Sequence, residues 1–213
     1  MSREKADPLP PERFEAILEG AGPKSEIRLE AAVAKGLARY LSELDRWRRR
    51  VNLTGNLTAE ELTAHVLESL APLSLIAAGS KLVDIGSGAG LPGLPLAIAR
   101  PDISATLVEP RGRRAAFLRH AGRALGLANV EVVQRRIEEV GGQTFGVATT
   151  RAVGGFDSWI GAASFLEPRG LLLAWTTDPE SVASGIGSRF EAAGVTPLPG
   201  SERRCVAAFR LRS

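Results

Sequence analysis

Residues 81–93 constrain the fold of this chain more than any other stretch. The apolar segment KLVDI is followed at once by glycines at positions 86, 88 and 90. Apolar and β-branched residues are typical of a buried parallel strand, and glycines let the backbone turn sharply and approach a ligand closely. Pro92 suits the first turn of a helix. The segment therefore predicts a strand, a tight turn and a helix, with a ligand site at the carboxyl end of the strand.

Two classes of ligand fit such a turn, a dinucleotide and S-adenosylmethionine. The dinucleotide pattern G-x-G-x-x-G requires glycine at position 91, where this chain has leucine. The chain instead has Asp84 two residues before the first glycine, and a carboxylate there repels a pyrophosphate but suits a cationic sulfonium amino acid. A second apolar segment, 104–108, ends in Glu109, which is spaced to bind ribose hydroxyls. We therefore predict S-adenosylmethionine, bound near Asp84, Glu109, Gly86, Gly88 and Gly90; the alternative is a tight turn without a ligand.

Length and composition set the class of protein. The 213 residues, 44% hydrophobic and 24% charged, are typical of one soluble globular domain. No apolar run is as long as a membrane span, and the charged, proline-rich start does not resemble a signal peptide. One cysteine excludes an intrachain disulfide framework and a thiolate metal cluster, and the two histidines lack metal-ligand spacing. We expect a cytoplasmic monomer that uses no metal and contacts no membrane.

The first part of the chain has a helical pattern. Apolar residues at positions 29, 33, 37, 41 and 44 have the spacing of one face of a helix. Thr58 and Glu61 have the spacing of a capping box, and the glycines and proline of 20–23 are expected to end the first helix. Helical segments are predicted at 11–18, 27–50, 58–67 and 69–77. Residues 1–78 are interpreted as a helical extension of a single domain, and 79–213 as its ligand-binding core.

From residue 81 onward, strand and helix patterns alternate. Strands are predicted at 81–85, 104–108, 130–134, 145–149 and 170–175, followed by a hairpin of 195–198 and 204–211. Helical segments are predicted at 92–99, 111–126, 136–140, 156–166 and 179–193. This alternation predicts an α/β fold with a doubly wound, mostly parallel seven-stranded sheet of the Rossmann-like type and an antiparallel edge.

The residues that are absent argue against a hydrolase and narrow the possible acceptors of a methyl group from S-adenosylmethionine. No G-x-S-x-G nucleophile turn is present. Methylation of pyrimidine C5 needs a cysteine nucleophile, and Cys205 lies on what we predict to be an edge strand, where it is interpreted as packing. Methylation of an exocyclic amine favours an Asn/Asp-Pro-Pro-aromatic element after the fourth strand, where this chain has Thr149 to Ala152. A ring nitrogen with a free lone pair, such as guanine N7, needs only positioning, an effect that contributes roughly 7–11 kcal/mol.

Arginine is unevenly distributed in a chain whose formal net charge is +3. Groups of arginine occur at positions 46, 48, 49 and 50, at 111, 113 and 114, at 135 and 136, and at 203 and 204. Each group alone is interpreted as a solvated helix face. Several groups that converge on one rim would form a phosphate-binding surface.

Several motifs resemble those of a known family, the bacterial small-subunit rRNA guanine-N7 methyltransferases, once called glucose-inhibited division protein B. The resemblance covers about residues 40 to 210, and the motifs occur in the family's order. They are Trp47 with Asn52-Leu53-Thr54, His65-x-x-Glu68-Ser69-Leu70, Gly86 to Gly93, Phe117-Leu118-Arg119, Leu125-Gly126-Leu127 with Asn129-Val130, Arg136-Ile137-Glu138, and Arg151-Ala152-Val153.

The resemblance implies a set of site residues and a substrate. Cofactor contacts would come from Gly86, Leu91, Ile137, Glu138 and Arg151, with Glu109 at the ribose and Ile137 and Glu138 beside the adenine. The acceptor would be a guanine of 16S rRNA, in naked RNA, a precursor particle or the small ribosomal subunit. Arg136 and Arg151 would lie beside the acceptor, where a guanidinium can hold guanine O6 or a phosphate. We count these two arginines as the candidate catalytic residues.

The chain departs from the family pattern at three places. The family usually has aspartate at Glu68, alanine at Ile137 and a lysine where this chain has Trp175-Thr176-Thr177. The last departure bears on how RNA is oriented and leaves the cofactor inference unchanged.

Some single residues have a structural and a functional interpretation. Trp47 is interpreted as core rather than as a platform for a base. His65 is interpreted as a hydrogen-bonded packing residue rather than a catalyst. Arg151 ends an apolar strand, where an unpaired charge is costly, so we expect a ligand or an acidic partner. Trp175 either stacks on a base or fills the space of the family's lysine.

We therefore predict an S-adenosylmethionine-dependent methyltransferase that acts on N7 of a guanine in 16S rRNA. The alternatives are a methyltransferase for a small molecule or a protein, and a non-catalytic RNA-binding module that keeps the cofactor fold.

Overall fold

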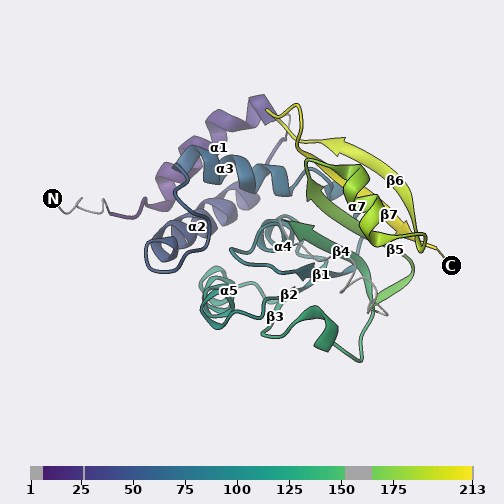
Figure 1. Cartoon of the computed structure of the whole chain (residues 1–213). Coiled ribbons are helices and arrows are strands. Elements are labelled where there is room, and N and C mark those ends of the chain that lie inside the picture. Colours follow the sequence, from purple (N-terminus) through teal and green to yellow (C-terminus); the bar gives the residue numbers. More distant parts are fainter. Residues whose placement is uncertain (1–6, 26, 152–164, 213) are drawn as a thin grey trace.

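The structure is a computed structural model that describes residues 7–25, 27–151 and 165–212. Its centre is a seven-stranded sheet with the strand order β3-β2-β1-β4-β5-β7-β6 (Figure 1). The strands are β1 (Lys81–Ile85), β2 (Ser104–Val108), β3 (Val130–Val133), β4 (Phe145–Arg151), β5 (Leu166–Thr176), β6 (Phe190–Pro197) and β7 (Cys205–Leu211).

The pairing of the strands confirms the predicted fold class. Strand β1 lies between β2 and β4 and is parallel to both, and β3 and β5 continue the parallel pairing outward. Strand β7 is antiparallel to β5 and forms the closing hairpin with β6. Because the carboxyl ends of β1, β2 and β4 meet at one edge, the loops that follow them converge there.

Alternation of side chains along β1 separates two hydrophobic cores. Leu82 belongs to the core shared with the helices α1 to α5, and Val83 and Ile85 belong to the core on the other face, which includes residues of α7. The helices of the α/β part are α4 (Gly93–Ala99), α5 (Gly112–Leu125), α7 (Pro179–Ile186) and the short η2 (Ile137–Glu139).

The helical extension packs on the first of these cores. Its elements are α1 (Pro11–Ser25), α2 (Ala31–Arg48), α3 (Ala59–Ser69) and η1 (Leu73–Leu75). The predicted capping box is present, since the Thr58 side chain accepts from the Glu61 amide while the Glu61 carboxylate accepts from the Thr58 amide. Fully buried residues of the extension, such as Phe14 and Tyr40, share one cluster with Leu82 of the sheet.

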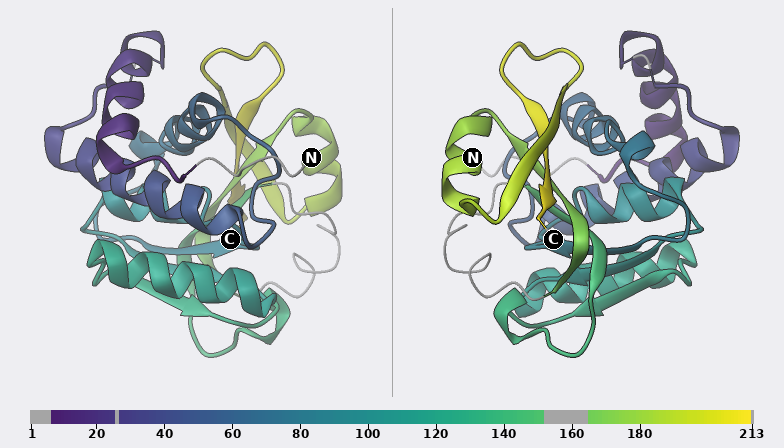
Figure 2. Two further views of the ribbon diagram at one scale, coloured as in Figure 1. Left: turned by 90° about the vertical axis from the view of Figure 1, so that its left-hand side faces the viewer. Right: turned by 90° about the vertical axis from the view of Figure 1, so that its right-hand side faces the viewer.

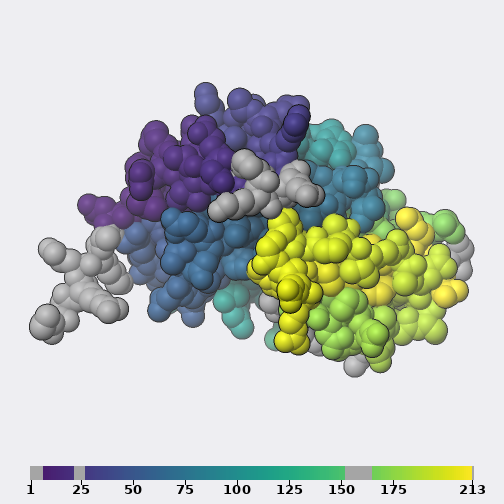
Figure 3. Space-filling view, turned by 90° about the horizontal axis from the view of Figure 1, so that it is seen from above, coloured from purple at the N-terminus to yellow at the C-terminus, as the bar shows by residue number. Residues whose placement is uncertain are grey.

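The hairpin lies next to the helical extension although the two are far apart in sequence. Figure 2 shows the hairpin of β6 and β7 beside the N-terminal helices and α7 apart from them, and Figure 3 shows the same neighbourhood on the surface. An ion pair between Arg204, before β7, and Glu68, on α3, joins the two regions.

Several predictions about elements are wrong, and the segment predicted as helical at 69–77 contains, after the end of α3, only the short turn η1. Helix α1 runs on to Ser25 instead of ending at residue 18, because its apolar face packs on α2 and α3 and carries the helix through Gly20. The predicted helix 179–193 ends at Ile186; Gly187 has φ +70°, and Phe190 already begins β6. The spacing of Val182, Ile186 and Phe190 mimics a helical face.

A further error concerns Cys205. It lies on β7, which is paired on both sides, so the edge strand is β6 and not the strand of Cys205. The thiol is buried, and its Sγ lies 3.6 Å from the carbonyl oxygen of Thr176. Burial raises the pKa of the thiol. The predicted helix 156–166 falls outside the described residues except at its end, where Leu166 begins β5.

Candidate active site

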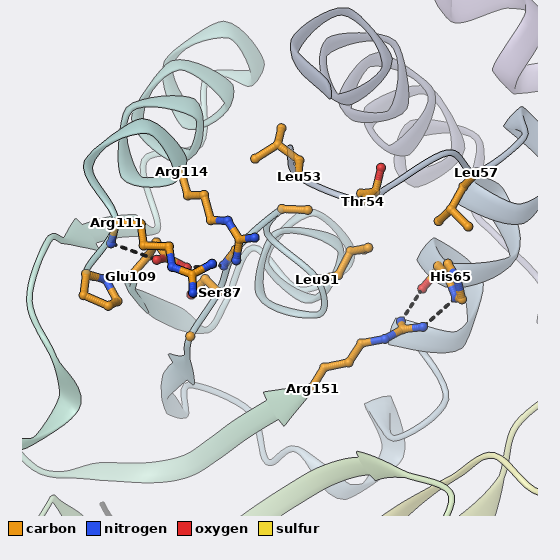
Figure 4. A pocket seen from close by; sticks show the side chains of 14 residues that line it. Leu53, Thr54, Leu57, His65, Ser87, Leu91, Glu109, Arg111, Arg114 and Arg151 are labelled. Atoms are coloured by element: carbon orange, nitrogen blue, oxygen red, sulfur yellow. Dashed lines mark hydrogen bonds between the residues drawn. The ribbon is translucent and has the colours of Figure 1, made fainter. Parts of the chain in front are cut away.

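A cavity of about 630 Å³ lies at the carboxyl edge of β1, β2 and β4 (Figure 4). Its size is that of a site for a small molecule or cofactor. Residues of the sheet edge form its base, and residues of the loop between α2 and α3 form its roof. The lining residues are Leu53, Thr54, Leu57, His65, Gly86, Ser87, Gly88, Ala89, Leu91, Glu109, Pro110, Arg111, Arg114 and Arg151.

The glycine-rich loop after β1 is held by backbone hydrogen bonds. The amides of Gly86 and Ser87 both donate to the carbonyl of Val108 at the end of β2, at 2.9 and 3.1 Å. The amide of Gly88 donates to Glu109 Oε2 at 3.0 Å. Gly86, Gly88 and Gly90 all have positive φ, between 52° and 88°, which explains the recurrence of glycine.

Glycines of this loop have two different roles. A Cβ at Gly88 would stand 3.7 Å from Arg114 Nη1 and 4.0 Å from Glu109 Oε2, so it would occupy the space between the loop and the end of β2. A Cβ at Gly90 would lie 2.5 Å from Leu94 Cδ1, and one at Gly93 would lie 2.4 Å from Leu107 Cδ2. Gly88 therefore leaves room in the cavity, whereas Gly90 and Gly93 allow α4 to pack on the sheet.

Asp84 lies beneath the loop and not among the residues that line the cavity. Its side chain is fully buried; Thr149 Oγ1 donates to Oδ1 at 2.8 Å, and the Gly93 amide donates to Oδ2 at 3.3 Å. Burial raises the pKa of Asp84 to about 6, although the Thr149 hydrogen bond opposes the rise. The carboxyl group therefore fixes the start of α4 against β4, and a direct contact with a cofactor stays a prediction.

Glu109 is the buried carboxylate of the cavity wall. Its Oε2 accepts from the Gly88 amide and its Oε1 from the Arg111 amide at 2.9 Å, so the side chain is fixed at the end of β2. Each carboxylate oxygen has a further lone pair, and this arrangement can accept hydrogen bonds from a diol. Arg111 and Arg114 lie on the same side of the cavity, and Arg114 Nη2 donates to the Asn52 carbonyl of the roof at 3.3 Å.

The helical extension touches the glycine loop directly. The hydroxyl of Tyr40, a fully buried residue of α2, donates to the carbonyl of Ala89 at 2.7 Å. Burial raises the pKa of Tyr40 well above its usual value, so the hydroxyl keeps its proton and remains a donor. Helix α2 therefore holds one carbonyl of the loop in place.

Opposite Glu109, the cavity is bounded by Arg151 and His65 (Figure 4). Arg151 ends β4, and His65 belongs to α3. Arg151 Nη1 donates to the His65 carbonyl at 3.1 Å, and Nη2 donates to Glu68 Oε2 at 2.9 Å. The charge of Arg151 thus has the acidic partner that the sequence led us to expect, and burial lowers the pKa of its guanidinium while Glu68 opposes that change.

Glu68 is the anion that organises this end of the cavity. Its side chain is 2% exposed and pairs with Arg151 through Oε2 and with Arg204 Nη1, 2.6 Å from Oε1. Burial alone would raise the pKa of Glu68, but its contact with His65 and the charges of Arg151 and Arg204 lower it overall. The indole N–H of Trp175 donates to the Glu68 carbonyl at 3.0 Å, so this tryptophan is part of the packing.

The structure brings together five of the predicted site residues and leaves the others elsewhere. Gly86, Gly88, Leu91, Glu109 and Arg151 line the cavity, whereas Gly90 packs behind it. The segment of Arg136, Ile137 and Glu138 lies after β3 and does not line the cavity: Ile137 is buried, and the other two are exposed. Their roles stay predictions. Trp47 packs on the rings of Phe117 and His120, as the core interpretation expects.

Comparison with known proteins connects this site to a family. Residues 34–180 match the family model described as rRNA small subunit methyltransferase G. The chain belongs to this family. It is 40% identical over 192 residues to "Ribosomal RNA small subunit methyltransferase G" of Halorhodospira halophila, covering 87% of this chain and 91% of the relative. It is 43% identical over 173 residues to the protein of that name from Sorangium cellulosum, covering 77% and 71%.

A solved structure shares the fold of this chain. The N-methyltransferase NodS from Bradyrhizobium japonicum, solved in complex with S-adenosyl-l-homocysteine, aligns with a TM-score of 0.58 at 19% identity and covers 85% of this chain and all of its own. The predicted family and the Rossmann-like methyltransferase fold are therefore confirmed.

Two general features of this chain concern the residues that the structure describes. Within 7–25, 27–151 and 165–212, no helix has both the length and the apolar character needed to cross a bilayer. In the same ranges, no three His, Cys, Asp or Glu side chains come together in a way that could hold a metal ion.

The sequence alone did not predict several residues of this cavity and its support. Arg114, Leu57 and Tyr40 contribute to the cavity or its support, and none was singled out from the sequence. The arginine group at 111–114, directly after Glu109, was the signal for Arg114. Tyr40 carried no signal beyond its place on an amphipathic helix.

Proposed function

We propose that this protein transfers the methyl group of S-adenosylmethionine to N7 of a guanine in 16S rRNA. The observation that carries the proposal is the cavity in which Glu109, the glycine loop and Arg151 meet, in a member of an rRNA methyltransferase family. The substrate is 16S rRNA itself or the small ribosomal subunit or its precursor.

The residues of the cavity fit the proposed cofactor. The space beside Gly88, which a Cβ would fill, and the fixed carboxylate of Glu109 suit a ribose bound over the end of β2. Leu91 supplies an apolar wall, and Leu53 and Leu57 of the roof exclude water. The proposed contacts also include Asp84 through its charge, and Ile137 and Glu138 on the adenine side.

The acceptor end needs no general base. The lone pair of guanine N7 forms the new N–C bond while the S–C bond of the sulfonium breaks and its electron pair stays on sulfur. No proton has to be removed from N7, so the protein contributes by orientation and by exclusion of water. Arg151 lies where the acceptor would enter, and Arg136 is proposed to contact the RNA outside the cavity.

The proposal is tested by deleting the gene and mapping 7-methylguanine in 16S rRNA by mass spectrometry. We expect one such guanine to lose its methyl group and to regain it when purified protein and S-adenosylmethionine are added to small subunits from the deletion strain. Unchanged methylation in the deletion strain would overturn the rRNA assignment. Titration calorimetry with S-adenosylmethionine tests the alternative of a non-catalytic module, because a module that does not bind the cofactor would release no heat.

We also propose that residues 1–78 and 79–213 form one methyltransferase domain. The fully buried Phe14 and Tyr40 share a core with the sheet, and no separate core is needed for the extension. Calorimetric unfolding should show a single transition, and two separated transitions would contradict this.

A further inference from the structure

The contacts of His65 favour one position for the proton of its ring. Its Nδ1 lies 2.5 Å from Arg151 Nη2 and 3.0 Å from Glu68 Oε2. A guanidinium can only donate hydrogen bonds, so the shorter contact requires a lone pair on Nδ1. Glu68 Oε2 already accepts from Arg151 at 2.9 Å and does not need a proton from the ring. We therefore assign the proton of the neutral ring to Nε2, because this tautomer leaves Nδ1 free to accept from Arg151.

This Nε2–H group is available to a ligand. His65 lines the cavity, its side chain is 24% exposed, and Nε2 has no hydrogen-bond partner among the residues that the structure describes. Arg151 also keeps donors that have no partner in the described part of the chain. One hydrogen of Nη1 and both hydrogens of Nη2 are engaged, which leaves the second hydrogen of Nη1 and that of Nε. His65 and Arg151 thus offer hydrogen-bond donors and no acceptor.

We propose that His65 Nε2–H, held in this tautomer by Arg151, selects the acceptor base by donating to the carbonyl O6 of guanine. The proposal rests on the proposed function and names the residue that determines its base specificity. On the edge that carries N7, guanine presents two acceptors, whereas adenine presents the N6 amino group next to N7. A surface that only donates hydrogen bonds can pair with the acceptors of guanine. Against adenine it would place its donors opposite the N6 amino group, which is also a donor, and two unpaired donors are costly in a water-poor site.

The hydrogen bond from His65 to O6 also favours methylation at N7. O6 engaged with a donor is not a free nucleophile, while the neighbouring N7 lone pair receives no proton from the protein. Glu68 acts through Arg151 and His65 and is a positioning residue in this arrangement, since it contacts both without lining the cavity.

Two substitutions separate the ring's two nitrogens. His65→Asn keeps a group near Nδ1 that can accept from Arg151 but removes the donor at Nε2. His65→Gln places its amide N–H near Nε2. We expect His65→Asn to lower kcat/KM for small subunits about tenfold, the effect of one lost hydrogen bond, and His65→Gln to stay within about threefold of the wild type. The dissociation constant for S-adenosylmethionine, measured by calorimetry, should be unchanged in both.

His120→Asn is the matched control. His120 lies outside the cavity, half-exposed beside Glu43 and Trp47, and the variant should retain wild-type methylation. If His65→Asn methylates like the wild type, or if its affinity for S-adenosylmethionine falls as much as its activity, the specificity role of His65 is wrong.

An altered base tests the contact with O6 itself. Small subunits are reconstituted with 2-aminopurine, which keeps N7 and lacks O6, at the acceptor position. The wild type should lose about tenfold in kcat/KM on this substrate, and His65→Asn should lose little more than it has already lost. Fully additive losses would overturn the proposal. If the wild type neither binds S-adenosylmethionine nor methylates natural subunits, the proposed function itself has failed.

Discussion

The two ends of the cavity are built in different ways. The end around Glu109 is made of consecutive residues of two neighbouring strands and their loops, and backbone amides hold it, as in the bond from Gly88 to Glu109. The end around Arg151 is made of side chains from α3, β4 and the segment before β7, held by ion pairs to Glu68. The first end depends on backbone geometry, and the second depends on buried charge.

This difference suggests separate roles and separate vulnerabilities. An end fixed by backbone geometry is sensitive to added volume. An end fixed by a buried carboxylate between two arginines is sensitive to neutral substitutions, because removal of one partner leaves charge uncompensated. The following variants are designed to break one end while preserving the other.

The largest effect is expected from Gly88→Val. The branched side chain would fill the space between the loop and Glu109, and we expect affinity for S-adenosylmethionine to fall about 100-fold or more in a folded protein. Calorimetric titration measures the affinity, and circular dichroism checks the fold.

Gly126→Val is the matched control for backbone strain. Gly126 also has positive φ, at +70°, and a Cβ there meets nothing within 4 Å. Both variants carry the cost of a left-handed valine, about 1–2 kcal/mol, but only Gly88→Val should lose the cofactor. Micromolar affinity retained in Gly88→Val would show that the cofactor does not use this space.

Arg151→Ala should affect the opposite end. We expect methyl transfer to small subunits to fall about 100-fold, since the variant removes both the wall of the acceptor end and the donor that fixes His65. Helical content should be nearly unchanged, because Glu68 still pairs with Arg204. Normal turnover in this variant would remove Arg151 from the site.

Glu68→Gln should lower stability rather than remove a substrate contact. Loss of the buried charge leaves Arg151 and Arg204 uncompensated, at a cost of about 3 kcal/mol in the free energy of unfolding near pH 7. Because the pKa of Glu68 is below its ordinary value of 4.5 in the fold, its contribution is complete above that value and is lost as the pH falls below it. Urea unfolding of both proteins at pH 7 and pH 4 should show the difference shrink; a constant difference would contradict the ion pairs.

The smallest effect is expected from Tyr40→Phe. The ring keeps its packing, but the Ala89 carbonyl loses its donor, which should cost about 1 kcal/mol of stability. If α2 positions the glycine loop, affinity for S-adenosylmethionine should also fall a few-fold. A stability loss without any change in affinity would limit Tyr40 to a packing role.

The contrast between the two ends also explains what the sequence could predict. The strands β1 and β2 and the turn between β1 and α4 follow from local patterns, so Glu109, Gly86 and Gly88 were predicted together with the ligand class. The motifs also led to the family and to Arg151, and the need for a partner of Arg151 follows from the cost of a buried charge.

Contacts between distant segments were not predictable in the same way. That Arg204 approaches Glu68, and that Trp175 donates to the Glu68 carbonyl, depends on how the hairpin packs beside α3. The helical spacing of Val182, Ile186 and Phe190 predicts a helix that continues to residue 190. The helix instead ends before Gly187, whose φ is positive, and β6 begins at Phe190. The partners of Asp84 were not predictable either, because its fully buried side chain bonds Thr149 of β4 and the start of α4; its contact with the cofactor stays a prediction.

The ion pair of Arg204 with Glu68 has a consequence for how the protein is made. Translation produces the glycine loop, Glu109 and Arg151 well before it reaches position 204. A chain cut short before that position lacks Arg204 and also β7, which pairs with both β5 and β6, so neither the sheet nor the ion pairs of Glu68 are complete until residues 204–211 have been made.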